Sequence, residues 1–135
     1  MDEAEKLLKK ACKVAPGYAS AFQNCATFLM QENRYDEAIP YVKQLVKITP
    51  SSIAGHNMLG LIYGRSQDFA NAERHFKIVV EIEPSSAGAY ANLAKVYAAQ
   101  KQFEKAKAVL RDGLTIKNIR NDQRDGLQTM LDRMP

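Results

Sequence analysis

The chain has 135 residues, is 46% hydrophobic and 25% charged, and carries a formal net charge of +4 at pH 7. This length and composition predict one globular domain. No apolar run reaches about 18 residues, so we expect no membrane insertion, and the first residues lack the apolar core of a signal peptide. Ala, Leu, Lys, Glu and Gln are abundant, which favours helices.

The first predicted element is an amphipathic helix over residues 2–14. Cys12 lies in it, and Cys25 follows in the next predicted helix. The two cysteines lack the spacing of a metal site, so we expect buried, reduced thiols rather than a disulfide or a reactive pair. Reduced thiols and the missing signal favour a cytoplasmic location, although the sequence assigns no compartment.

The prolines Pro16, Pro50 and Pro84 recur at a spacing of 34 residues. Each 34-residue unit holds two amphipathic segments, as in 52–65 and 69–83, which predict a pair of helices. The Ser-Ser pairs after the last two prolines are expected to cap the helices that follow. Further columns of shared character at this spacing are Ala4, Ala38, Ala72 and Ala106; Phe22, His56 and Tyr90; and Cys25, Leu59 and Leu93.

Gly60 lies in the middle of a predicted helix, where glycine costs about 1 kcal/mol relative to alanine. At the repeat spacing it aligns with Ala26 and Ala94. A column of small residues predicts that each first helix lies close against a neighbouring helix, which offsets the local cost.

The pattern His56-x2-Leu59-Gly60-x2-Tyr63, followed by Ala72-x3-Phe76 and Pro84, resembles the tetratricopeptide repeat (TPR) family, with His56 in place of the usual tryptophan. The resemblance covers residues 1–120 and implies an all-α fold, a right-handed α-solenoid of antiparallel helix pairs (TPR superhelix). We expect one domain over residues 1–135. Its expected parts are the second helix of a partial repeat in 1–18, full repeats in 19–52, 53–86 and 87–120, and a capping helix in 121–135.

Both ends depart from the pattern. The first helix of the leading repeat is absent, so the face with Leu7 and Leu8 is expected to be partly uncovered. Residues 122–133 carry an apolar stripe on one side only, and Gln128 replaces the small residue of its column, as expected of a terminal cap. The stripe is Leu127, Met130, Leu131 and Met134.

The resemblance implies that the first helices line a concave groove that binds a peptide or a helix of another protein. The groove is expected to be nearly uncharged, with Arg65 and Lys95 as its charged residues. The expected groove residues are Ser20, Gln23, Asn24, Thr27, Asn57, Met58, Leu61, Arg65, Asn92 and Lys95.

Two known binding modes of the family can be compared with this groove. The clamp that grips C-terminal carboxylates uses paired Lys or Arg side chains and Asn. The corresponding positions here are Gln23, Thr27, Met58, Gly88 and Asn92, none of which is a cation, so we expect no clamp. Asn24, Met58 and Asn92 share a column that resembles the asparagine ladder of the O-linked GlcNAc transferase array. Amides can pair with a peptide backbone in either sense, but Asn24 and Asn92 could equally be hydrated groove residues. Extended-peptide and helix-in-groove binding both stay open.

The second helices carry most of the charge, with both signs intermixed. Lys9, Lys43, Lys77 and Arg111 form one column, and carboxylates lie nearby, which argues against a nucleic-acid partner. We expect His56 and His75 to be packing residues, because neither has a nucleophile at helical spacing. No phosphate loop, metal motif or cofactor motif occurs.

The expected function is therefore a non-enzymatic scaffold for protein–protein interaction through the concave groove. The alternative is a structural or self-assembly module, or a fragment of a longer TPR array, that associates through its open N-terminal edge.

Overall fold

The computed structural model describes residues 2–135, which form eight α-helices and no β-strand. This confirms the all-α prediction, and the helices begin and end within a few residues of the predicted bounds. They are α1 (Glu3–Val14), α2 (Ala19–Gln31), α3 (Tyr35–Ile48), α4 (Ile53–Arg65), α5 (Phe69–Ile82), α6 (Ala87–Ala99), α7 (Phe103–Leu114) and α8 (Asn121–Arg133). Within this part of the chain, no helix is both long enough and apolar enough to cross a bilayer.

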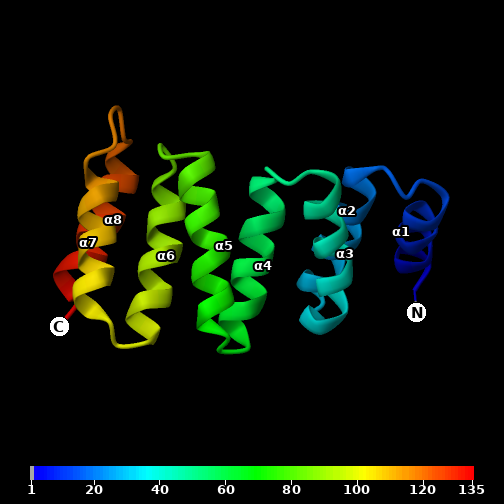
Figure 1. Ribbon diagram of the computed structural model, residues 1–135, viewed down its shortest axis with the longest axis horizontal. Coiled ribbons are helices and arrows are strands. Elements are labelled where there is room, and N and C mark those ends of the chain that lie inside the picture. Colours follow the sequence, from blue (N-terminus) through cyan, green and yellow to red (C-terminus); the bar gives the residue numbers. More distant parts are fainter. Residues whose placement is uncertain (1) are drawn as a thin grey trace. The chain divides into compact units, whose positions relative to one another are not determined.

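The helices pack into two compact units. One unit ends at Ile62 and contains α1, α2, α3 and most of α4, while the other spans Tyr63–Pro135. In the first unit, α2 packs against both α1 and α3. In the second unit, α6 packs against α5, α7 and α8 (Figure 1).

The turn after each first helix has the same hydrogen-bonded geometry. Asn33, Gln67 and Lys101, which share one repeat column, adopt φ values of 62°, 62° and 61°. The amide of the following residue donates to a carbonyl five residues back, as in Arg34 N to Leu29 O at 2.8 Å. This is a Schellman motif, which usually has glycine at the left-handed position. Here three non-glycine residues hold that conformation.

Serine and aspartate side chains cap several helices, as the Ser-Ser pairs predicted. Ser52 Oγ accepts a hydrogen bond from Gly55 N at 3.0 Å, and Ser86 Oγ accepts one from Ala89 N at 3.3 Å. At the start of α1, Asp2 Oδ1 accepts a hydrogen bond from Glu5 N at 2.8 Å. Each cap satisfies an amide that has no partner within its helix.

The predicted column of small residues lies in the core: Ala26 and Ala94 are fully buried, and Gly60 is buried. A second close approach, which the repeat columns did not single out, occurs at Gly113 of α7. A Cβ atom there would lie 3.1 Å from Tyr90 Cβ and 3.0 Å from Leu127 Cδ1. Glycine at this position therefore lets α7 lie close to α6 and α8.

Helix α8 packs its predicted apolar stripe against the core of the second unit. Leu127 is buried, and the other three residues of the predicted stripe are partly buried against the same core. Gln128 is exposed and donates a hydrogen bond to Asp132 Oδ1 at 2.8 Å. The polar side of α8 therefore faces solvent.

Candidate functional site

Helix α2 presents an uncharged polar face. Ser20, Gln23 and Asn24 are exposed and Thr27 is half-buried, whereas Leu29 and its neighbours on the opposite side are buried. The spacing of these polar residues places them on one side of the helix. All four predicted groove residues of α2 therefore lie together on a surface that the core does not use.

The structure brings Ser20 and Asn24 into a hollow that the sequence did not predict. Its volume is about 380 Å³, and its other walls include Val14 at the end of α1 and Tyr18 just after it. Val14 and Tyr18 are 73% and 67% exposed, although both are large and apolar for most of their surface. The sequence signal for this hollow was the series of apolar residues at helical spacing in the first helix. That series predicted only a partly uncovered helix face.

The predicted residues of α4 are less accessible. Asn57 and Met58 are half-buried, and Leu61 is 46% exposed. Asn57 Oδ1 is shielded from solvent and accepts no hydrogen bond from residues 2–135. A partner could reach this oxygen only after the side chain rotates, so Leu61 is the most open contact that α4 offers in the first unit.

The remaining predicted residues belong to the second unit. Arg65, in the last turn of α4, and Lys95 of α6 are exposed, and Asn92 of α6 is half-buried. Asn92 and Lys95 are three residues apart and share one side of α6. The predicted site thus divides into one set of residues in each unit.

Both histidines have structural contacts, as predicted. His56 is buried, and its Nε2 donates a hydrogen bond to the Pro50 carbonyl oxygen at 2.8 Å. Tyr90, one repeat later, donates from its hydroxyl to the Pro84 carbonyl at 3.0 Å. His56 therefore fills a recurring role in which the aromatic column is tied to the proline turn.

His75 stacks against Tyr63, with ring centroids 5.8 Å apart and planes inclined by 11°. This contact joins α5 to the end of α4 within the second unit. Both residues therefore contribute to helix packing, which agrees with the predicted role of His75.

The two cysteines are buried and free, which confirms the prediction. Burial raises the pKa of the Cys12 thiol to about 11 and also raises the pKa of Cys25. Both thiols are protonated at neutral pH, and a protonated thiol is a poor nucleophile. Among residues 2–135, no three His, Cys, Asp or Glu side chains are grouped as a metal site requires.

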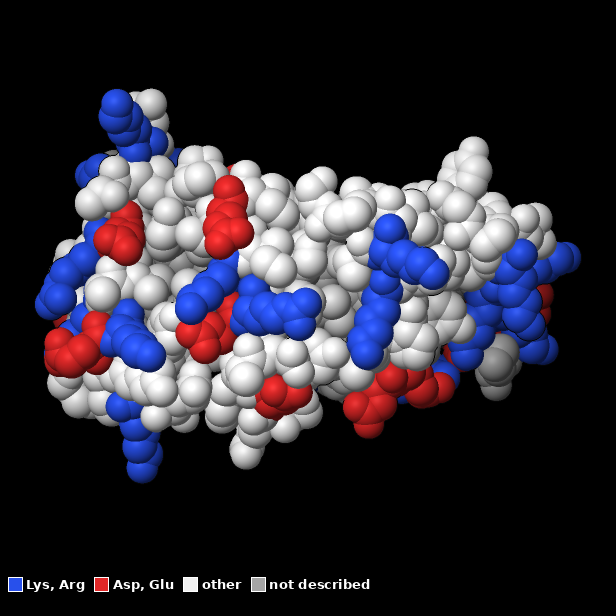
Figure 2. Space-filling view, in the orientation of Figure 1, with Lys and Arg blue, Asp and Glu red and all other residues white. Residues whose placement is uncertain are grey.

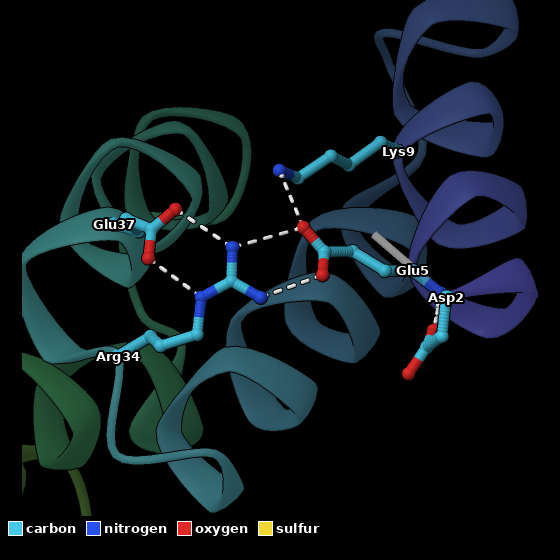
Figure 3. A network of polar contacts seen from close by, with 5 residues as sticks. All are labelled: Asp2, Glu5, Lys9, Arg34 and Glu37. Atoms are coloured by element: carbon cyan, nitrogen blue, oxygen red, sulfur yellow. Dashed lines mark hydrogen bonds and ion pairs between the residues drawn. The ribbon is translucent and has the colours of Figure 1, made fainter.

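A buried carboxylate joins α1 to the start of α3 (Figure 3). Glu5 is only 3% exposed, and its carboxylate accepts hydrogen bonds from Nη1 and Nη2 of Arg34, at 2.6 and 3.0 Å. Lys9 Nζ lies 2.8 Å from Glu5 Oε2, and Arg34 also binds Glu37. The guanidinium of Arg34, followed by Lys9, lowers the pKa of Glu5 to about 2. Periodicity within one helix does not predict this network, because Arg34 and Glu5 lie 29 positions apart in the sequence.

The charged surfaces contain both signs, as the sequence predicted. Lys77 Nζ pairs with Glu73 Oε1 at 3.0 Å, and Lys107 Nζ pairs with Glu104 Oε1 at 3.6 Å. Figure 2 shows acidic and basic side chains side by side over much of the second unit. A phosphate backbone binds best where cations are clustered and unopposed, and this face of the second unit does not provide such a cluster.

A family model for the tetratricopeptide repeat matches residues 1–62 and 65–118 of the chain. No curated protein matches it. The chain is similar to the crystal structure of MamA, with a TM-score of 0.79, 20% identity, and coverage of 96% of this chain and 83% of that one.

Two further solved structures are similar. A MamA RS-1 double mutant has a TM-score of 0.80 and 19% identity, with coverage of 97% of this chain and 74% of that one. YrrB, described as a TPR protein with an unusual peptide-binding site, has a TM-score of 0.80 and 21% identity, with coverage of 94% and 65%. At these identities the likeness establishes the shared TPR solenoid fold.

Proposed function

Because this chain belongs to the tetratricopeptide repeat family, we propose that it is a non-enzymatic scaffold that binds a segment of another protein through the exposed faces of its first helices. We further propose that residues 1–135 act as one TPR domain with the repeat boundaries expected from the sequence. The peptide-binding site in the name of the similar protein YrrB supports a peptide-binding role.

The observation that carries the proposal is the uncharged, exposed face of α2. Ser20, Gln23 and Asn24 take no part in the core, yet they are grouped on one side of the helix. Polar side chains on such a face can pair with the amides and carbonyls of a bound backbone without selecting a charge. Asn92 supplies the same chemistry in the second unit, where Lys95 adds a single positive charge.

The expected affinity of such a surface is modest. Each hydrogen bond to a peptide contributes about 0.5–1.5 kcal/mol net. Leu61, exposed on α4, adds apolar area that a partner could bury, at about 25 cal/mol for each Å². Several contacts of both kinds are therefore needed, which favours a partner segment that spans more than one helix.

The roles of the reactive side chains support a scaffold rather than an enzyme. His56 and His75 are engaged in structural contacts, and Cys12 and Cys25 are buried thiols with raised pKa values. The intermixed ion pairs on the second helices support a protein rather than a nucleic acid as the partner.

The test is affinity capture from a lysate of the source cells, read by mass spectrometry, followed by calorimetry with the captured segment. The variant Asn24→Ala/Asn92→Ala/Lys95→Ala removes polar contacts from both units. We expect it to bind the segment at least roughly tenfold more weakly than wild type, since up to three hydrogen bonds are lost.

A matched control carries Lys43→Ala and Arg111→Ala, which are exposed on the second helices α3 and α7. This control should bind like the wild type. If the first variant keeps full affinity while the control loses it, the partner binds the second helices and the proposal is wrong.

A further inference from the structure

One side of α1 exposes apolar side chains to solvent. Leu7 is 60% and Val14 is 73% exposed, and the exposed residues Ala4 and Ala11 continue the same side at helical spacing. Tyr18 follows the helix and is 67% exposed. Three of the five large exposed hydrophobic residues of the described chain therefore lie in this one stretch, which marks an interaction surface rather than scattered exposure.

The hollow described above lies at the C-terminal end of this apolar side. Val14 and Tyr18 form its wall on one side, and Ser20, Ala21 and Asn24 of α2 form the other. Its volume of about 380 Å³ lies within the range of about 300–1,000 Å³ that is usual for ligand pockets. A large apolar side chain of a partner could enter it, with two polar groups at its edge.

Positive charge borders the same side. Lys6, Lys10 and Lys13 are exposed and form no ion pair with the described residues, in contrast to Lys9, which binds Glu5. Lys10 lies one turn from both Leu7 and Val14, so its ammonium group flanks the apolar stripe. Glu3 lies in the first turn, so the positive charge is concentrated towards the C-terminal half of α1. Figure 2 shows basic side chains gathered over α1, at the right of the view.

We propose that the apolar side of α1, together with this hollow, is a docking site for an amphipathic α-helix of another protein whose apolar stripe is flanked by Asp or Glu. Leu7 and Val14 are two turns apart, a rise of about 10.5 Å. Apolar residues at the same spacing on a second helix can pack against them. Acidic flanks on that helix would pair with Lys10 and Lys13. This site adds α1 to the exposed face of α2, with which it shares Ser20 and Asn24.

Two other occupants fit the observations less well. A second copy of the chain that paired through the same side of α1 would bring lysines to face lysines. A flat bilayer surface would leave the hollow unfilled. An acidic helix satisfies the apolar stripe, the hollow and the charges together.

The probes are two synthetic peptides of about three heptads with the same leucine pattern, one flanked by Glu and the other by Lys. Binding to the full chain is measured by fluorescence anisotropy. We expect the Glu peptide to bind at least about tenfold more tightly than the Lys peptide. Lys10→Glu/Lys13→Glu should reverse this preference, and Leu7→Ser/Val14→Ser should weaken the binding of the Glu peptide at least tenfold.

The control Ile82→Ser replaces an exposed hydrophobic residue of α5 that belongs to neither proposed site, and it should leave the binding unchanged. All replaced side chains are exposed, so circular dichroism should report the same helix content for every variant. Equal binding of the two peptides, or no binding of either, contradicts the proposal.

Two further measurements distinguish the other occupants. If light scattering shows a dimer that Leu7→Ser/Val14→Ser converts to a monomer, the occupant is a second copy. If the same variant abolishes binding to phosphatidylcholine–phosphatidylserine vesicles, the occupant is a bilayer. Either result overturns the assignment to an acidic helix. A protein that stays monomeric, does not bind the vesicles and prefers the Glu peptide supports it.

Discussion

Glu5 of α1 and Glu73 of α5 occupy the same repeat position in different units, but their surroundings differ. Each pairs with the lysine one turn later, at 2.8 Å for Lys9 and 3.0 Å for Lys77. Glu5 also binds the Arg34 guanidinium through two hydrogen bonds and is 3% exposed. The second partner of Glu73 is instead the Tyr97 hydroxyl, at 2.6 Å, and the Glu73 side chain is 25% exposed.

The difference shows what a repeat specifies and what it leaves open. The Glu–Lys pair follows from two sequence positions on one helix, so it recurs wherever both residues recur. The second partner lies outside that helix. At α1 this partner is a forked cation that also binds Glu37, while at α5 it is a neutral hydroxyl. Only the first arrangement ties two consecutive second helices together.

The largest expected effect is that of Arg34→Ala on α1. The substitution removes both hydrogen bonds that tie Glu5 to the start of α3 and leaves a carboxylate that is largely shielded from water. We expect the backbone amides of α1 to exchange with solvent roughly tenfold faster or more, measured by hydrogen-exchange mass spectrometry. Tyr97→Phe should cost about 1 kcal/mol in the second unit and leave the exchange of α1 unchanged.

Arg34→Lys is the conservative control for this experiment. Lysine keeps the charge but cannot present the planar fork that binds Glu5 and Glu37 at once. The exchange of α1 should fall between wild type and Arg34→Ala. Equal exchange in all three proteins would mean that the network does not hold α1 in place.

The acid dependence of stability should also separate the two glutamates. The pKa of Glu5 is about 2, below the ordinary value of 4.5. Its ionised form therefore stabilises the fold above about pH 4.5, and this contribution is lost as the pH falls from about 4.5 to about 2. In urea unfolding over this range, Glu5→Gln should lose less stability than the wild type.

Glu73 provides the comparison within the same titration. Its pKa is lowered mainly by the Tyr97 hydroxyl and then by Lys77, so Glu73→Gln should also flatten the acid dependence. We expect the flattening to be larger for Glu5→Gln, because Glu5 has the charged partner. A larger flattening for Glu73→Gln would mean that the Tyr97 hydroxyl and Lys77 stabilise the ionised carboxylate more than Arg34 and Lys9 do.

The smallest expected effect concerns the left-handed residues of the Schellman turns, which are held by backbone hydrogen bonds within a few residues. Gln67 and Lys101 both have a left-handed backbone in the Schellman turns. Gln67→Gly and Lys101→Gly should each raise the free energy of unfolding by about 0.5–1 kcal/mol, because glycine adopts this conformation without steric cost. Asn33→Gly should raise the free energy of unfolding by less, since asparagine tolerates the left-handed backbone.

Gln100→Gly serves as the control. Gln100 lies just before the left-handed residue and has φ near −89°, so glycine there should not raise the free energy of unfolding. Urea unfolding measures all four variants. Unequal gains at Gln67 and Lys101 would mean that tertiary contacts influence even these turns.

Most of the helical architecture could be predicted from the sequence, because it depends on local patterns. The prolines, the alanine column and the small residues at Ala26, Gly60 and Ala94 locate the helices and the buried sides. The polar stripe of α2 follows from the same periodicity, so Ser20, Gln23 and Asn24 could be assigned to one exposed face.

The hollow and the charge network could not be predicted in this way. Val14 and Tyr18 line a cavity with Ser20 and Asn24 only because the chain turns between α1 and α2 and brings them together. Arg34 reaches Glu5 across 29 positions of sequence. No periodicity within one helix contains that information.

The sequence by itself therefore determined the elements that depend on nearest neighbours: the helices of residues 2–135, the serine caps, and which side of each helix is buried. Hydrophobic periodicity and hydrogen bonding within a few residues are sufficient for these. The tertiary structure alone decided which carboxylate is held by a cation, how closely α7 approaches Tyr90, and where a hollow opens beside exposed apolar residues. These depend on distances between side chains that are remote in sequence, and only the packed helices set those distances.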